Sequence, residues 1–306
     1  MSSNPPLIGA IEAGGTKFIL ATGTGPDDLR DVERISTTTP AETLQRCVEY
    51  FTAAQKKHGS LAALGIGTFG PAGVDPGSPE WGYITTTPKP GWQQTDMAGP
   101  LKRALGVPVA FDTDVNAAVY GEWLWGAGKG CNVALYLTIG TGIGGGVLID
   151  GRPLHGLLHP EMGHIRIPRP PALKDFAGAC PWHGDCLEGL ASGPAMAARW
   201  GVAADTLPPD HAAWEAEAAC LASACASFSC TLSPHRIILG GGVMDSPGLL
   251  AQVQEKTRTL LNGYLQHPAI TAKIDSYITA PGLGSRAGIC GALALGMEAA
   301  RAGNPM

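Results

Sequence analysis

The 306-residue sequence lacks several features that mark particular classes of protein. It has no run of basic residues, and its formal net charge of −5 argues against nucleic acid or an anionic membrane as its main partner. No segment approaches the roughly 18 to 20 continuous apolar residues of a membrane span. The first residues, MSSNPPLIGAIEAGG, have neither the basic start nor the long apolar run of a secretory signal, so we expect a soluble, cytoplasmic protein.

The composition that is present suits a globular protein with a sizeable interior. Hydrophobic residues make up 44% of the chain and charged residues 15%, and this length predicts one or two domains. The eight cysteines have no extracellular address, which favours thiols and metal ligands over disulfides.

The most specific motif is CPWHGDC, which has the spacing of a metal site. Cys180, His183 and Cys186 are each separated by two residues, and Gly184 relaxes the backbone between them, so three ligands can converge from one turn. His164, sixteen residues before Cys180, is the natural fourth ligand. Four protein ligands leave no position open for water, which predicts a structural zinc ion.

Alternatives to this ligand set exist in the same stretch of sequence. His155 and His159 compete for the place of the fourth ligand, and the two cysteines could instead form a disulfide. Glu161 and Glu188 stand close to the proposed ligands in sequence. A metal that fixed both segments would therefore also fix two carboxylates, which are suitable acceptors for the hydroxyl groups of a polyol.

A strand, a glycine-rich turn and a second strand occur twice. Residues 7–23 contain the turn GGT, and residues 131–151 contain a formal GxGxxG at Gly140, Gly142 and Gly145. The second motif fails as a dinucleotide fingerprint because a strand, not a helix, follows it, and the chain has no Walker A loop. Two interpretations fit these motifs. Either both are ordinary glycine-rich hairpins, or they belong to two related lobes and bind phosphate oxygens through their N–H groups and Thr hydroxyls.

The remaining pattern predicts alternating helices and strands. The expected helices are 40–58, about 97–105, 115–126, 211–232, 248–265 and 286–300, and the expected strands lie in 61–73, 107–114, 234–240 and 274–279. Residues 74–95 resemble a loop. A triple-Gly turn follows the strand PHRIILG and precedes a helix, as expected for backbone packed against a nucleotide.

These motifs resemble the actin-like, hexokinase-like ATPase fold, an α/β fold of the ribonuclease H type. The similarity to the ROK family of sugar kinases and repressors rests on GGTK at 14–17, TDVN at 113–116, GTGIGGG at 140–146, ExGH at 161–164, GDCLEGLASG at 184–193 and ILGGGV at 238–243. EAGGTK, TTPKPGW, DTDVNAA, HPEMGHI and CPWHGDCLEG resemble the bacterial fructokinases of that family in particular.

The resemblance implies two lobes around a central cleft. The small lobe would comprise residues 1–118 and a C-terminal helix at about 286–306, and the large lobe, 119–285, would carry the zinc loop and the nucleotide site. Asp114 matches the catalytic base that accepts the proton of the sugar hydroxyl; its sequence context also fits an N-cap of the following helix. The implied sugar contacts are Gly70, Thr113, which replaces the usual Asn, Glu161, His164 and Glu188.

The resemblance also implies an ATP site and two metals. The matching ATP positions are Gly15, Thr16, Lys17, Thr141, Gly142, Pro194, Gly241, Gly242 and Val243. A strand follows Lys17, which favours an exposed place on that strand over a contact with phosphate. Glu12 replaces the Asp that is usual before the first phosphate loop. The change leaves it open whether Glu12 helps to hold Mg²⁺. His164, Cys180, His183 and Cys186 match the zinc ligands, with His183 in place of a thiol.

The implied activity is that of an ATP-dependent hexose kinase, with fructose as the expected substrate. Glucose, mannose or an N-acetylhexosamine are alternative substrates. A sugar-sensing repressor of the same family is a further alternative, but repressors carry an added N-terminal DNA-binding module, and here the first phosphate strand begins by about Leu7. We therefore expect ATP and a hexose as ligands, Zn²⁺ and Mg²⁺ as cofactors, and a homodimer that binds neither nucleic acid nor membrane.

Overall fold

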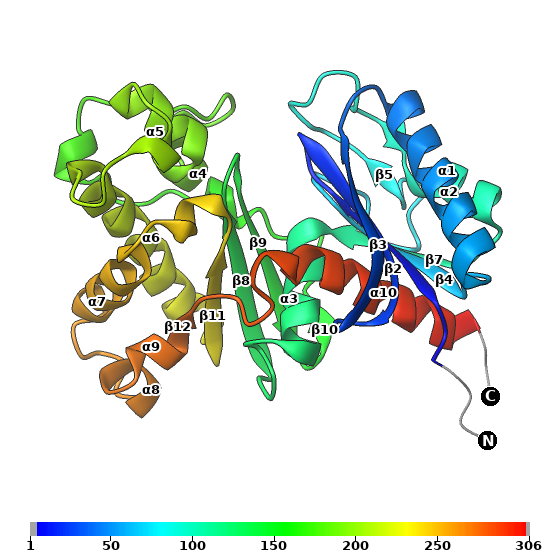
Figure 1. The fold of residues 1–306 in the computed structure, drawn as a ribbon. Coiled ribbons are helices and arrows are strands. Elements are labelled where there is room, and N and C mark those ends of the chain that lie inside the picture. The colour runs from blue at the N-terminus through cyan, green and yellow to red at the C-terminus, as the bar shows by residue number, and fades with distance from the viewer. Residues whose placement is uncertain (1–4, 304–306) are drawn as a thin grey trace. The chain divides into compact units, whose positions relative to one another are not determined.

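Two five-stranded sheets, one in each of two units, organise the chain (Figure 1). The computed structural model describes residues 5–303. Unit 1 contains the described residues up to Lys129, the segment Arg152–Pro160 and the described residues from Arg286 onward. Unit 2 contains Gly130–Gly151 and Glu161–Ser285.

The first unit extends beyond the expected boundary at residue 118. It includes all of α3, Asp114–Trp125, because this helix packs along α10, Ala287–Gly303, within the same unit. Residues 1–4 and 304–306, which belong to the ranges expected for the small lobe, lie outside the described residues.

The sheet of unit 1 combines an antiparallel meander with two parallel strands. Its strands are β1 Ile8–Ala13, β2 Lys17–Gly25, β3 Asp28–Ser36, β4 Ala63–Thr68 and β7 Val109–Thr113. Their order is β3-β2-β1-β4-β7, in which β4 runs parallel to both β1 and β7. A separate pair consists of β5, Tyr83–Ile84, and β6, Thr95–Asp96.

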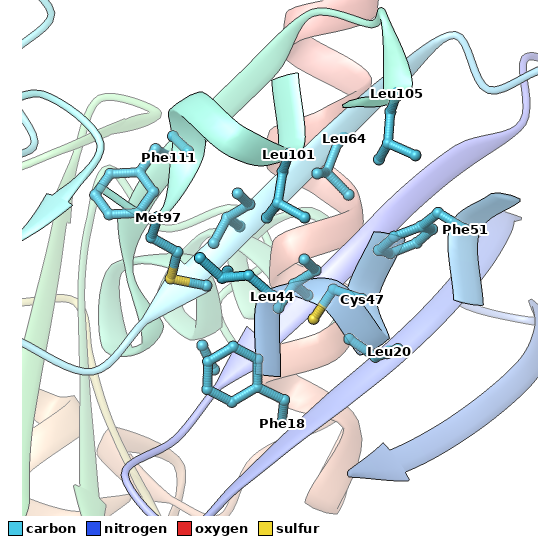
Figure 2. Close-up of a cluster of buried hydrophobic side chains, with 14 of the residues drawn as sticks. Phe18, Leu20, Leu44, Cys47, Phe51, Leu64, Met97, Leu101, Leu105 and Phe111 are labelled. Atoms are coloured by element: carbon cyan, nitrogen blue, oxygen red, sulfur yellow. The ribbon is translucent and has the colours of Figure 1, made fainter. Parts of the chain in front are cut away.

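Helices cover both faces of this sheet. On one face lie α1, Pro40–His58, and α2, Ala98–Leu105, and Figure 2 shows their apolar side chains meeting those of the strands. The sequence pattern 40–58 predicts α1 correctly: Thr39 caps it by accepting a hydrogen bond from the N–H of Glu42, and an apolar stripe that includes Phe51 is buried. Phe51 is fully buried, so Phe51→Ala would cost about 3–5 kcal/mol.

The other face of the sheet is covered by α10, near the C-terminal end of the chain. Ile8 and Ala63 of the sheet belong to one buried cluster with Leu293 of α10. The approach is close enough to require glycine, since a Cβ on Gly65 of β4 would lie 1.8 Å from the carbonyl oxygen of Ala292. Residues from opposite ends of the sequence therefore complete unit 1.

The sheet of unit 2 repeats the strand order of the first sheet. Its strands are β8 Val133–Ile139, β9 Ile143–Ile149, β11 Arg236–Gly240 and β12 Ile278–Thr279, with β10, Arg152–Pro153, as the short edge strand where the chain returns to unit 1. The order β10-β9-β8-β11-β12 repeats β3-β2-β1-β4-β7, with β8 antiparallel to β9 and parallel to β11.

Helices and short helical turns supply the rest of unit 2. The helices are α4 Leu187–Ala191, α5 Gly193–Trp200, α6 Ala212–Leu232, α7 Leu249–Leu261, α8 Pro268–Thr271 and α9 Ile274–Tyr277. The 3-10 turns of the chain are Met162–His164, Pro171–Leu173, Ala204–Thr206, Gly242–Asp245 and Gly284–Arg286. Among the described residues, no helix is both long and apolar enough to cross a membrane.

Several elements differ from the sequence-based expectation, among them β5 and β6, of which β5 and the first residue of β6 fall in the stretch 74–95 that resembles a loop. The strand expected at 274–279 is wrong for its first four residues, which form α9. There the hydroxyl of Ser276 donates to the carbonyl oxygen of Lys273, a local bond that competes with strand pairing. The edge strand β3 was not predicted, because most of its side chains are polar and exposed and give no apolar alternation.

Candidate functional site

The first glycine turn joins β1 to β2 in unit 1. The N–H of Gly14 donates to the carbonyl oxygen of Lys17 over 2.9 Å. Thr37 also holds the turn: its hydroxyl donates to the carbonyl oxygen of Gly14 (2.7 Å) and its N–H to the carbonyl oxygen of Thr16 (3.0 Å). A Cβ on Gly15 would meet nothing within 4 Å. Thr16 and Lys17 are exposed. The turn is therefore fixed on its inner side and open on the side where a phosphate group could approach.

Glu12, just before this turn, has a buried carboxyl group with an unused oxygen. Burial raises its pKa to about 7, against the opposing effects of Lys17 and the N–H of Ile289. The carboxyl group lies against α10 so closely that a Cβ on Gly288 would be 2.4 Å from Glu12 Cδ. Its Oε2 makes no hydrogen bond to the described residues. A buried carboxylate oxygen of this kind fits the hydrated Mg²⁺ that accompanies ATP.

Asp114 begins α3 directly after β7. The cap of this helix is Thr113, whose hydroxyl accepts a hydrogen bond from the N–H of Asn116 over 3.2 Å. The alternative that Asp114 is the N-cap is therefore wrong, although one of its oxygens does accept the N–H of Val115. Asp114 is half-buried, whereas Thr113 is only 4% exposed.

The position of this junction in the sheet favours a binding site. Thr68 of β4 pairs in register with Thr113 of β7, so the carboxyl ends of these parallel strands are adjacent. Ligands of open α/β sheets bind outside this edge. Gly70, another predicted sugar contact, follows β4 by two residues and is joined to Pro71 by a cis peptide bond.

His155 and His159, the competing zinc candidates, make other contacts in unit 1. His155 Nε2 lies 2.9 Å from Asp112 Oδ2. His159 is buried and its Nε2 accepts the N–H of Ala72 over 3.1 Å. The ring of His159 also lies beside Gly70, 3.4 Å from the place of a Cβ there. Neither residue belongs to the Cys/His cluster of unit 2.

That cluster consists of the four predicted zinc ligands: His164, Cys180, His183 and Cys186. His164 Nδ1 lies 3.2 Å from His183 Nδ1, 3.7 Å from Cys180 Sγ and 3.5 Å from Cys186 Sγ. A tetrahedral zinc ion, with Zn–N of about 2.0–2.1 Å and Zn–S of about 2.3 Å, separates its ligand atoms by about 3.3–3.8 Å. The donor set and its spacing therefore fit zinc, and both thiols are free of disulfides.

The backbone around the cluster is arranged by short-range contacts. Gly184 has a φ of 64°, and its N–H and carbonyl both pair with Cys180, which closes the turn. Cys186 also caps α4, since its Sγ accepts the N–H of Gly189 over 3.4 Å. Asp185 forms ion pairs with Arg166 and Arg169 on neighbouring segments. The metal loop is thus joined to the start of α4, two residues before Glu188.

Glu188 connects α4 to the second glycine turn. Its Oε2 accepts the N–H of Ile143 over 2.9 Å, and a Cβ on Gly142 would lie 2.7 Å from the same oxygen. Thr141 is exposed at the tip of the turn. Glu188 therefore supports the turn in addition to any contact with sugar.

Glu161 begins the ExGH motif of unit 2. The residue has exposed surface, but its carboxyl group is surrounded by enough protein that burial, together with the charge of Glu188, raises its pKa to about 7. The carbonyl oxygen of Glu161 accepts the N–H of His164. The ExGH segment therefore reaches the cluster through its own 3-10 turn.

Three segments predicted to contact ATP meet in unit 2. The N–H of Gly193 donates to Gly140 over 2.8 Å, and a Cβ on Gly193 would lie 3.8 Å from Val243. Pro194 follows as an exposed residue in the first turn of α5. This arrangement brings the second hairpin, the start of α5 and the triple-glycine turn together.

Glycine is present at Gly241 and Gly242 of the triple turn for different structural reasons. Gly241 has a φ of 92°, and a Cβ there would lie 2.3 Å from the carbonyl oxygen of Ile139. Gly242 is exposed and a Cβ there would meet nothing within 4 Å. Packing explains the first, whereas open space at the second leaves room for a ligand.

Sequence reasoning missed several residues that hold these segments in place. Thr37, Asp112 and Asn116 are buried polar residues that bond to a predicted site residue or its neighbour. The sequence DTDVN contains a signal for two of them, since Asp and Asn flanking a strand–helix junction commonly bond to local backbone.

Comparison with known proteins yields consistent matches. A sequence model described as the ROK family matches residues 8–299. The chain is 48% identical to a fructokinase from Zymomonas mobilis, covering 98% of this chain and 99% of that protein. It is 44% identical to a fructokinase from Pediococcus pentosaceus, covering 96% and 98%. Among solved structures, a ROK family glucokinase from Streptomyces griseus in complex with glucose and AMPPNP matches with a TM-score of 0.74 at 25% identity, covering 95% and 99%.

Proposed function

Because the chain belongs to the ROK family, we propose that it is a fructokinase that converts D-fructose and ATP to fructose 6-phosphate and ADP. The observation that carries this proposal is its 48% identity to a fructokinase over 98% of its length. The actin-like α/β fold expected from the sequence is confirmed and agrees with it. A glucose kinase is the second candidate, favoured by the structural match to a glucokinase that binds glucose and AMPPNP.

In the proposed reaction, Asp114 accepts the proton of the sugar hydroxyl as its oxygen attacks the γ-phosphorus of ATP. The new O–P bond forms, the bond to the β-phosphate oxygen breaks, and ADP leaves. General base catalysis of this kind contributes about 10²- to 10⁴-fold. Most of the remaining acceleration in phosphoryl transfer comes from alignment and charge neutralisation.

Backbone N–H groups and glycines supply that alignment. The turns at Gly15 and Gly142 would bind the phosphate chain, and the open backbone at Gly242 would lie against the adenosine. Glu161 and Glu188 would accept hydrogen bonds from sugar hydroxyls. Mg²⁺ accompanies ATP as part of the substrate, and the unused oxygen of Glu12, just before the first turn, would be a candidate partner for it.

Zinc, when bound, would be held by His164, Cys180, His183 and Cys186 and supplies a structural cross-link. With four protein ligands it has no position for a reacting group. Its effect on the reaction is indirect, because Cys186 caps the helix that carries Glu188.

The proposal includes a cytoplasmic location and a homodimer. All eight cysteines are free, and thiol ligands for zinc persist in a reducing compartment. Sedimentation velocity across a concentration series tests the dimer, which a single species of 31.5 kDa would contradict.

The decisive experiment is an ADP-release assay with fructose, glucose, mannose and N-acetylmannosamine at matched concentrations. We expect the highest kcat/KM for fructose and formation of fructose 6-phosphate. A higher kcat/KM for glucose would favour the second candidate, and turnover of none of the four sugars would refute a hexose kinase.

A further inference from the structure

A hydrogen-bonded pair of His155 and Asp112 beside the predicted base is not used by the proposed chemistry. Asp112 is 3% exposed, and its Oδ2 lies 2.9 Å from His155 Nε2. Its Oδ1 accepts two further hydrogen bonds, from the N–H of Thr113 (2.7 Å) and the side-chain amide of Asn116 (2.8 Å). One buried carboxylate thus joins His155 to residues on both sides of Asp114.

The other end of this connection leads to a predicted sugar contact. His155 lies in the segment Arg152–Pro160, whose last residue is bonded covalently to Glu161. His159, in the same segment, accepts the N–H of Ala72. The segment is therefore fastened at two points, to the end of β7 through His155 and to the turn after β4 through His159.

Polar contacts hold this segment, and its central apolar residues do not. Leu157 is 100% exposed and Leu158 is 68% exposed, so neither packs into a core. Because β4 and β7 are parallel neighbours, both fastening points lie at the carboxyl edge of one sheet, where ligands of such folds bind.

We propose that His155 is a positioning residue for hexose phosphorylation, which through Asp112 holds the turn of Asp114 and the segment leading to Glu161 in one arrangement. This inference rests on the proposed hexose kinase function. The role differs from that of a catalytic residue, because His155 acts through Asp112 and not on the reacting atoms.

The surroundings of His155 favour its charged form. The hydrogen bond that His155 donates to Asp112 raises the pKa of His155, and the charges of Asp112 and Asp75 add to the effect. Burial lowers the pKa of His159, which keeps that ring neutral as an acceptor. The interaction between His155 and Asp112 is therefore strong while the imidazole is protonated, and it weakens as pH rises through the raised pKa of His155.

The test compares His155→Gln, Asp112→Asn and the double variant with the wild-type protein. We expect His155→Gln to raise KM for fructose about tenfold or more, the scale on which small misplacements act, while KM for ATP stays within about twofold. We also expect the alkaline decline of kcat/KM for fructose in wild type to be absent from the variant. The double variant should be no worse than Asp112→Asn alone, since both changes break one interaction.

A matched control exists on the far side of the same unit. His58 of α1 forms a similar pair with Asp31, at 2.5 Å, away from the carboxyl edge of the sheet. His58→Gln should leave both KM values and the pH profile unchanged.

The other possible results distinguish failure of this inference from failure of the proposed function. Unaltered fructose kinetics in His155→Gln, equal losses for fructose and ATP, or additive effects in the double variant would overturn the inference and leave the proposed function intact. If His155→Gln does not fold, Asp112→Asn and the wild-type pH profile decide the same question. A wild-type protein that phosphorylates no hexose would overturn both the function and this inference.

Discussion

The two sheets have the same strand order but carry different chemistry. In unit 1 the fifth strand, β7, runs directly into Asp114, whereas in unit 2 the corresponding strand, β12, is followed by Ala280 and Pro281. In unit 2 the long connection from β10 to β11 contains the Cys/His cluster, whereas in unit 1 the connection from β3 to β4 is built around α1. The shared scaffold explains the recurrent hairpins, and the additions to it explain why only one unit has a candidate base and only the other a candidate zinc site.

The hairpins themselves also differ in how they are supported. A threonine from the end of β3, Thr37, holds the first turn, and a carboxylate from α4, Glu188, holds the second. The second turn is therefore coupled to the cluster through α4 and the first is not. This difference makes the two turns respond differently to the same substitution.

The largest expected effect is the loss of turnover when Asp114, the residue that follows β7, is replaced. Asp114→Ala should lower kcat by about 10²- to 10⁴-fold with nearly unchanged ATP binding, because it removes only the proton acceptor. Asp275→Ala, in α9 three residues before β12, is the control and should retain wild-type turnover. Coupled ADP-release kinetics and calorimetric ATP titration measure both. Substantial residual turnover in Asp114→Ala would contradict the assignment of the base.

Removing the metal should affect sugar binding more than nucleotide binding. Cys180→Ala removes one of four ligands, so we expect loss of bound zinc and about 10- to 100-fold weaker binding of fructose, as the loop that leads to Glu188 loses order. Cys230→Ala, an exposed thiol of the same unit, is the control. Atomic emission measures the zinc content of each variant, and steady-state kinetics measure its KM for fructose. A zinc-free protein with wild-type KM for fructose would refute this coupling.

A matched pair of glycine substitutions sharpens the contrast between the turns. Gly142→Ala places a methyl group 2.7 Å from Glu188, so we expect it to displace that carboxylate and to cost about 1 kcal/mol through the lost hydrogen bond to Ile143. Gly15→Ala meets no protein atom and should leave the melting temperature unchanged, while raising KM for ATP if phosphate binds there. Thermal unfolding and ATP kinetics test both variants, and equal melting temperatures would contradict the difference in support.

A further difference from the open turn at Gly15 is the pH dependence of stability that comes from the buried carboxyl group of Glu12. Below pH 4.5 Glu12 is protonated in both states; between pH 4.5 and about 7 the unfolded chain loses this proton and the folded protein keeps it. Stability therefore falls as pH rises through this range, by roughly 3 kcal/mol in total for this group. Glu12→Gln should remove that slope and be more stable than wild type at pH 8. Urea unfolding at pH 5 and pH 8 measures it.

A variant of a second buried carboxyl group extends that measurement. Glu217 of unit 2 is buried, burial raises its pKa well above the usual value, and its Oε1 has no partner among the described residues. Glu217→Gln should therefore show the same direction of change as Glu12→Gln. Wild-type slopes in both buried variants would mean that these carboxyl groups are ionised in the folded protein.

Much of this arrangement could be predicted from the sequence, for identifiable reasons. Residues 40–58 combine a cap, a leading proline and an apolar stripe, so local information is sufficient for α1. Cys180, His183 and Cys186 were predicted by spacing, because ligands within one turn must lie close together, whereas His164 was one of three candidates for the fourth ligand. His155 and His159 could not be excluded in this way, since their partners Asp112 and Ala72 are more than forty residues distant in sequence. Thr37 was missed because its partners, Gly14 and Thr16, also lie outside its own turn of the chain.

The position of α10 has a consequence for how the chain is made. Synthesis proceeds from the N-terminus, so β1 and β4 emerge from the ribosome long before Leu293, which they need to cover one face of their sheet. Unit 2, whose strands all precede Ser285, can fold while that face is still bare. A chain that ends shortly before Ala287 and is released from the ribosome should therefore contain a protease-resistant second unit and a first unit that lacks its final helix.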